Sequence, residues 1–196
     1  MKRAAALLPL WLAACAADEP DERLEHRFSA RPVMLVASSE LDPECLDGLK
    51  VAALWYRERG ATLTLDVLDP LARVLNGFVV GGQVGVVPGR LNRGVRGQTR
   101  LALTAGGDIF GAEITLAFCD ELSVTHECGH ALGLVHVGDH DNLMFPSIEY
   151  DGWELDDEQL AFIEDAELGT WVSYATTVPL RWDELDHVVV IECGGD

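Results

Sequence analysis

Three histidines and a glutamate lie within eleven positions, in the segment "HECGHALGLVH" at residues 126–136. An α-helix turns by about 100° per residue, so His126 and His130 share one face and can bind a single cation, with Glu127 beside them. Neutral imidazole nitrogens suit zinc, and a glutamate next to the first histidine can act on a zinc-activated water without ligating the metal. The segment therefore predicts a zinc site in which Glu127 is the catalytic base.

The third histidine can reach the same metal only if the helix ends before it. His136 is six positions after His130 and would point about 240° away on a continuing helix. Gly133 can adopt the left-handed conformation that stops a helix and reverses the chain, so we expect it to return His136 to the metal as third ligand. Cys128 lies about 200° around the helix from His126 and is expected in the core or in a disulfide.

The pattern H-E-x-x-H-x-x-G-x-x-H, followed by Met144 in "HVGDHDNLMFP", resembles the metzincin metalloproteases and among them the matrixins. The resemblance covers roughly residues 32–168 and is highly specific only over 126–146. It implies a zinc-dependent endopeptidase with one catalytic Zn²⁺ and a protein or peptide substrate. By the same resemblance Met144 lies beneath the zinc without binding it, and a wall of the substrate pocket is formed by Phe145, Pro146, Ser147 and Ile148.

The chain also departs from the matrixin pattern. Val137 stands where matrixins usually carry serine, Ile148 stands where they usually carry tyrosine, and there is no "PRCGxPD"-type cysteine switch. Family members usually bind calcium as well, but no ligand motif in this sequence supports a calcium site. How activity is kept latent does not follow from the sequence.

The segments around the motif predict an α+β fold in one domain. A helix is expected from the cap Asp42 through Pro43 to a stop at Gly60, and a later one begins with the capping-box pair Asp156 and Gln159. Strands are expected within residues 31–39, 61–69, 78–90, 99–104, 108–118 and 181–196. The resemblance implies a metzincin-like arrangement: a twisted mixed β-sheet with two long helices, a zinc cleft and a small C-terminal helical subdomain.

One edge strand of such a sheet commonly pairs with an extended peptide, and the candidates are "GAEITLAF" at 111–118 and "RLALT" at 100–104. The final segment, "RWDELDHVVVIECGGD", is expected to form a short strand ending at Cys193 and has no functional interpretation.

The chain has five cysteines, of which Cys15 belongs to the N-terminal export segment described in the next paragraph. The other four are an even count, which permits two disulfides in an oxidising compartment. A helix from Asp120 would hold Cys119 and Cys128 on the order of 12 Å apart, too far for a disulfide. If two bridges form, we therefore expect one to join Cys45 or Cys193 to each of them.

The first residues predict export. Residues 1–14 read as a signal peptide, and "LAAC" resembles the bacterial lipobox, in which the cysteine, here Cys15, carries the lipid. The alternative is an ordinary secretory signal that is cleaved at small residues, in which case Cys15 has no special role. Residues 15–31 suit a solvated tether, so the catalytic domain spans 32–196. We expect a cell-envelope lipoprotein, or otherwise a secreted protein.

The formal net charge of −19 makes nucleic acid a poor partner and would repel an anionic membrane surface. Membrane attachment is therefore expected only through the lipid on Cys15, and the chain is expected to be a monomer. The alternative to an endopeptidase is a non-catalytic, zinc-binding exported lipoprotein, whose site would be closed by a fourth protein ligand. Cys128 is the obvious candidate for that ligand, but its helix face argues against it.

Overall fold

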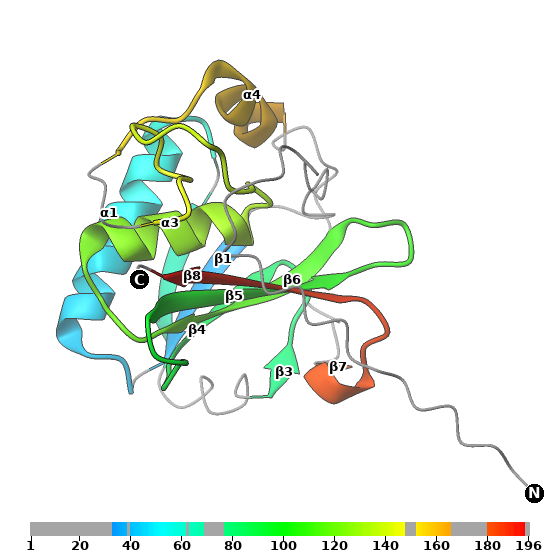
Figure 1. Cartoon of the computed structure of the whole chain (residues 1–196). Helices are drawn as coiled ribbons and strands as arrows, with labels where there is room; N and C mark the ends of the chain where they lie inside the picture. The colour runs from blue at the N-terminus through cyan, green and yellow to red at the C-terminus, as the bar shows by residue number, and fades with distance from the viewer. Residues whose placement is uncertain are drawn as a thin grey trace, which may run out of the picture.

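The computed structural model describes residues 33–38, 40–61, 63–68, 77–147, 152–165 and 180–194. The predicted signal peptide and tether, with Cys15, lie outside these residues, as does Ile148. Figure 1 shows a twisted sheet with helices α1 and α3 packed on one side and helix α4 beyond α3. The expected α+β class is confirmed.

The helices are α1 (Pro43–Glu58), α3 (Glu121–Ala131) and α4 (Asp157–Asp165), and a short 3-10 helix spans Trp182–Glu184. The strands are β1 (Val33–Ser38), β2 (Leu63–Leu68), β3 (Phe78–Val79), β4 (Gln83–Pro88), β5 (Val95–Leu103), β6 (Ile109–Leu116), β7 (Leu180–Arg181) and β8 (Val188–Gly194). Among the described residues no helix is both long and apolar enough to cross a bilayer.

The main sheet is mixed and has the strand order β2-β1-β4-β6-β5-β8, while β3 and β7 form a separate antiparallel pair. Strands β2, β1, β4 and β6 are parallel, and β5 is antiparallel to both of its neighbours. The turn at "AGGD" joins β5 to β6, as the sequence predicts, with the Thr104 N–H donating to the Asp108 carbonyl at 2.8 Å.

Two expectations about the sheet edge are wrong. The segment "GAEITLAF" lies mainly in β6, which is internal between β4 and β5. The segment "RLALT" lies in β5, but the outer edge of β5 is paired with β8, the C-terminal strand. No local pattern in the sequence predicts this pairing, because it joins segments far apart in the chain.

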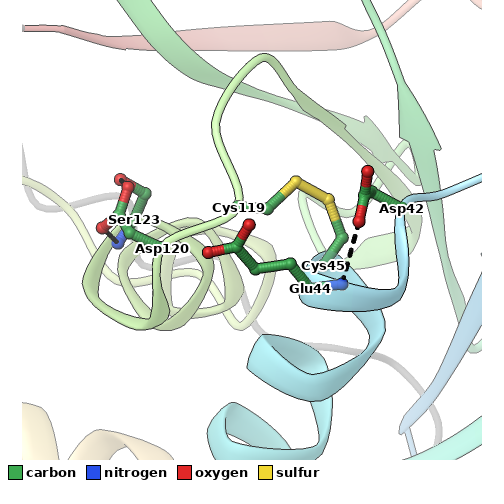
Figure 2. Close-up of a disulfide and its surroundings, with 6 residues drawn as sticks. All are labelled: Asp42, Glu44, Cys45, Cys119, Asp120 and Ser123. Atoms are coloured by element: carbon green, nitrogen blue, oxygen red, sulfur yellow. Dashed lines mark hydrogen bonds between the residues drawn. A yellow bond between two sulfur atoms is a disulfide. The ribbon is translucent and has the colours of Figure 1, made fainter.

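Both long helices start at capped N-termini that one disulfide holds together. The Glu44 N–H donates to the Asp42 carboxylate at 3.1 Å before α1, and the Ser123 N–H donates to the Asp120 carboxylate at 2.9 Å at the start of α3. A disulfide joins Cys45 in α1 to Cys119, just ahead of α3 (Figure 2). This is one of the pairings that the sequence left open. A second bridge, which the even count permits, is absent from the described residues, where Cys128 and Cys193 are both buried thiols.

The principal core lies between the sheet and these two helices, and it includes Leu35, Leu49, Leu101 and Met144. A smaller cluster on the opposite face of the sheet joins Val79, Ala102 and Trp182. Helix α1 therefore supports α3, the helix that carries the histidine motif, by packing against it.

Candidate metal centre

Helix α3 carries the first two histidines and the glutamate into the interior. The side chains of His126, Glu127 and His130 are each no more than 1% exposed. Cys128, on the other side of the helix, is buried in the core, as its helix position predicts. The motif therefore lies on a buried helix and not on a solvated surface helix.

Gly133 ends the helix and reverses the chain, as the sequence predicts. Its φ of 98° lies in the left-handed region. The Leu134 N–H donates to the Gly129 carbonyl at 3.0 Å and the Gly133 N–H donates to the His130 carbonyl at 2.9 Å, which is the Schellman pattern of a helix C-terminus. The reversal brings His136 back to the face of α3 that carries the first two histidines.

The three imidazoles converge through their Nε2 atoms. The distance is 3.0 Å from His130 to each of the other two histidines and 3.3 Å between His126 and His136. The Nδ1 atoms of His126 and His130 donate to the carbonyls of Leu143 and Leu134, at 2.6 and 2.8 Å. These bonds fix the tautomer, so that the Nε2 lone pairs face one another.

Burial keeps this cluster uncharged. Desolvation lowers the pKa of His126 to about 4 and that of His136 to about 3, and it holds the pKa of His130 well below its ordinary value. Each of these nitrogens therefore presents a lone pair at neutral pH, the form that binds a metal ion.

The donor set fits zinc. Ligands at about 2.0 to 2.1 Å from a tetrahedral zinc are separated from each other by about 3.3 Å. The observed separations of 3.0 to 3.3 Å are close to this spacing. The Nε2 atoms present lone pairs to one another and hold no proton between them. A cation at their centre would interact favourably with all three lone pairs.

Glu127 lies between the metal centre and strand β5. The Thr99 hydroxyl donates to Glu127 Oε2 at 2.6 Å, and a side chain at Gly97 would overlap the Glu127 carboxylate. Within the described part of the chain, Oε1 has no hydrogen bond of normal geometry. Burial raises the pKa of Glu127 to about 7, although the Thr99 hydroxyl and the Cys193 thiol each lower it. Thr99 and Gly97 hold the carboxylate in place.

Cys193 is a fourth potential donor, and the sequence interpretation missed it. Its Sγ lies 3.4 Å from His136 Nε2, and the four donor atoms of His126, His130, His136 and Cys193 all lie within 4.8 Å of one another. From the sequence, Cys193 is a candidate disulfide partner, and Cys128 is the candidate fourth ligand that its helix face argues against. Only the pairing of β8 with β5 brings Cys193 to the histidines.

The turn after the motif lies beneath the metal helix. Met144 is fully buried, and a side chain at Gly129, on α3 between the two histidines, would overlap its Sδ. The Asn142 side chain accepts from the Met144 N–H at 2.8 Å and donates to Gln159 of α4 at 2.8 Å.

Of the residues predicted to form the substrate-pocket wall, Phe145, Pro146 and Ser147 follow Met144 directly and are half-buried. Ile148 lies outside the described residues. The capping box of Asp156 and Gln159 forms as predicted, with the Gln159 N–H donating to the Asp156 carboxylate at 2.8 Å and the Asp156 N–H donating to Gln159 at 3.0 Å.

Comparisons with known proteins agree with the motif. The Matrixin family model matches residues 111–165, which include α3 and α4. Among solved structures, the chain is similar to high choriolytic enzyme 1 (HCE-1), a hatching-enzyme zinc protease from the medaka fish Oryzias latipes. The identity is 13% and the TM-score 0.34, over 76% of this chain and 68% of that chain, a likeness too weak to support a shared function. No curated protein matches. Over residues 111–165, which include the three histidines and Glu127, the chain is similar to the Matrixin family.

Proposed function

We propose that this protein is a zinc-dependent endopeptidase in which His126, His130 and His136 hold the zinc and Glu127 is the general base. The observation that carries the proposal is the convergence of three histidine Nε2 atoms beside a buried glutamate. The glutamate lies on the same helix as two of these histidines. The Matrixin match over the same residues supports it.

Zinc, when bound, supplies a Lewis acid for water and for the peptide carbonyl. The protein's own residues do the rest. The Nδ1 bonds to Leu143 and Leu134 hold two of the imidazoles in place. Thr99 orients the Glu127 carboxylate through Oε2, which leaves Oε1 to take a proton from water and to return it to the leaving amine.

We propose that the protein acts outside the cytoplasm, attached to a membrane through a lipid on Cys15. The "LAAC" segment supports this placement. Mass spectrometry of protein from the membrane fraction should then show a mature N-terminus at diacylglyceryl-Cys15. A soluble mature form that starts elsewhere and carries no lipid would contradict the anchor and leave export intact.

The catalytic proposal is tested by zinc content and peptide cleavage on the same folded preparations. Glu127→Ala should retain one zinc per chain and lose about 10² or more in cleavage of an unfolded protein, since positioned acid–base catalysis contributes about 10² to 10⁴. Glu121→Ala, which removes an exposed carboxylate from the first turn of the same helix, is the matched control and should keep its activity.

These measurements should be made in the native chain and in the Cys193→Ala chain, because the Cys193 thiol lies within the donor set. If zinc-loaded Glu127→Ala keeps more than about a tenth of the parent activity, Glu127 is not the base. If neither zinc-loaded parent chain cleaves peptides, the endopeptidase proposal is wrong.

One observation favours the alternative, a zinc-binding protein without catalytic activity. Structural zinc sites are closed by four protein ligands, and here Cys193 supplies a fourth potential donor. In that case removal of the thiol would lower zinc affinity and produce no cleavage. The endopeptidase proposal expects cleavage by the same variant.

A further inference from the structure

We propose that Cys193 is the fourth ligand of the bound zinc and that strand β8 is an internal inhibitor, which occupies the edge of β5 where a peptide substrate would pair. This inference rests on the proposed endopeptidase function for its inhibitory part. The ligation part concerns only this chain's own thiol and can be measured without activity.

Strand β8 takes the place that an extended peptide would take. It runs antiparallel to β5 at the end of the sheet (Figure 1). In the register of this pair, Thr99 lies opposite Ile191 and Gly97 lies opposite Cys193. Residues Gly97 and Thr99 are also the ones that contact Glu127. A peptide that pairs with this edge would therefore pass directly beside the base, and β8 already occupies that path.

The alternation of side chains along β8 directs the thiol inward. Val188 and Val190 are 37% and 45% exposed, whereas Val189 and Ile191 pack against the core, and Cys193 is fully buried. Cys193 thus continues the inward-facing series of the strand. Gly97, directly opposite, has no side chain to separate the thiol from the Glu127 carboxylate.

The chemistry of the thiol suits the fourth coordination position of a three-histidine zinc site. A thiolate binds zinc at about 2.3 Å, which places it about 3.5 Å from each histidine nitrogen of a tetrahedral site. The Cys193 Sγ is 3.4 Å from His136 Nε2, and the longest separation in the set, 4.8 Å, would shorten as the metal draws the donors together. Ligation by Cys193 would fill the position that a substrate and the attacking water need.

Strand β8 places fewer fully buried side chains in the core than the central strand β1 does. Among its described residues only Cys193 is fully buried, and Val189 and Ile191 pack against the core while partly exposed, whereas β1 contributes the buried Val33, Leu35 and Ala37. Besides the backbone pairing with β5, a side-chain bond runs from Gln98 to Glu192 at 2.7 Å, at a half-buried position. The burial of β8 side chains is therefore greatest near its C-terminal end, where Cys193 meets the metal donors.

The first experiment compares Cys193→Ala with Cys128→Ala, which removes the other buried thiol. Zinc X-ray absorption should show one sulfur scatterer at about 2.3 Å in the zinc-loaded native chain and in Cys128→Ala, and none in Cys193→Ala. Cobalt in place of zinc should give a thiolate-to-metal absorption band that disappears only in Cys193→Ala. Cleavage of an unfolded protein should rise at least about tenfold in Cys193→Ala, as expected if fewer than about a tenth of native molecules are open.

The second experiment weakens the strand and leaves the thiol intact. The Leu103 N–H donates to the His187 carbonyl at 3.0 Å, so by antiparallel alternation the Ile191 N–H points to β5 and the Val190 N–H points to solvent. Ile191→Pro should therefore release β8, lose the zinc–sulfur signal and raise cleavage. Val190→Pro places the same ring on the outward side and should change both readouts much less.

The outcomes separate the two proposals. A native zinc site with only nitrogen and oxygen ligands would overturn the ligation by Cys193. A sulfur signal that disappears in Cys193→Ala, with no cleavage by any zinc-loaded chain, would keep the ligation and overturn the endopeptidase. Equal cleavage by the native chain and by Cys193→Ala would keep the endopeptidase and overturn the inhibition.

Discussion

Replacement of Gly133 by alanine should weaken zinc binding about five- to thirtyfold without removing any ligand, because about 1–2 kcal/mol of backbone strain then opposes the bound geometry. Gly133 has a φ of 98°, which residues with a Cβ adopt only at that cost. In the metal-free chain the loop can relax and let His136 move away. Zinc binding must restore the reversal, so the strain is subtracted from the binding free energy.

The assay is competition for zinc with a chromophoric chelator at fixed pH, accompanied by thermal unfolding of the metal-free chain. Gly77→Ala is the matched control, since Gly77 has a similar φ of 92° with no atom within 4 Å of an added Cβ. Its strain is the same, but it lies outside the metal centre. Gly77→Ala should therefore lower stability and leave zinc affinity unchanged.

Two results would refute this reasoning. Zinc affinity of Gly133→Ala equal to that of the native chain would mean that the reversal at Gly133 does not position His136. An equal loss of affinity in Gly133→Ala and Gly77→Ala would mean that zinc binding follows overall stability and not local geometry.

Three further changes have outcomes set by contacts already described. Thr99→Val removes the hydroxyl that orients Glu127; it should cost about 1–3 kcal/mol in urea unfolding and lower cleavage by the Cys193→Ala chain, with zinc content unchanged. Replacing Cys45 and Cys119 together by alanine should cost about 2–4 kcal/mol in urea under non-reducing conditions. Gln159→Leu leaves the buried Asn142 amide unpaired and should lower the free energy of unfolding by about 1–3 kcal/mol, measured by circular dichroism.

Each of these changes has its own control. Thr104→Val removes an exposed-turn hydroxyl from the end of β5 and should not lower cleavage. Reductant should destabilise the native chain but not the double alanine variant, and an equal effect on both would show that the Cys45–Cys119 bridge is not what stabilises the fold. Gln98→Leu removes an amide whose bond to Glu192 is only half-buried. If Gln159→Leu lowers the free energy of unfolding by no more than Gln98→Leu does, burial does not make the Gln159 bond more important.

The local features of the site could be read from the sequence, because the residues that create them are neighbours in the chain. The shared face of His126 and His130, the reversal at Gly133 and the capping box of Gln159 all depend on spacings of a few residues. The class of fold also followed from the order of strand and helix patterns.

The features that the sequence did not reveal depend on contacts between distant segments. The bond between Cys193 and His136 spans 57 residues, and nothing in "VVVIEC" states which strand it joins or in which register. A shift of one residue in that register would point the thiol to solvent. The choice among the disulfide pairings is non-local for the same reason, with 74 residues between Cys45 and Cys119.

Strand β8 also governs how the molecule meets other copies of itself. A chain whose β8 has detached presents the bare edge of β5 together with a loose apolar segment, "VVVI" at 188–191, and each is a ready partner for the other in a second molecule. An opened population would therefore be prone to strand-exchanged dimers and to aggregation as its concentration rises. The docked strand covers the edge of β5 at which such an exchange would begin.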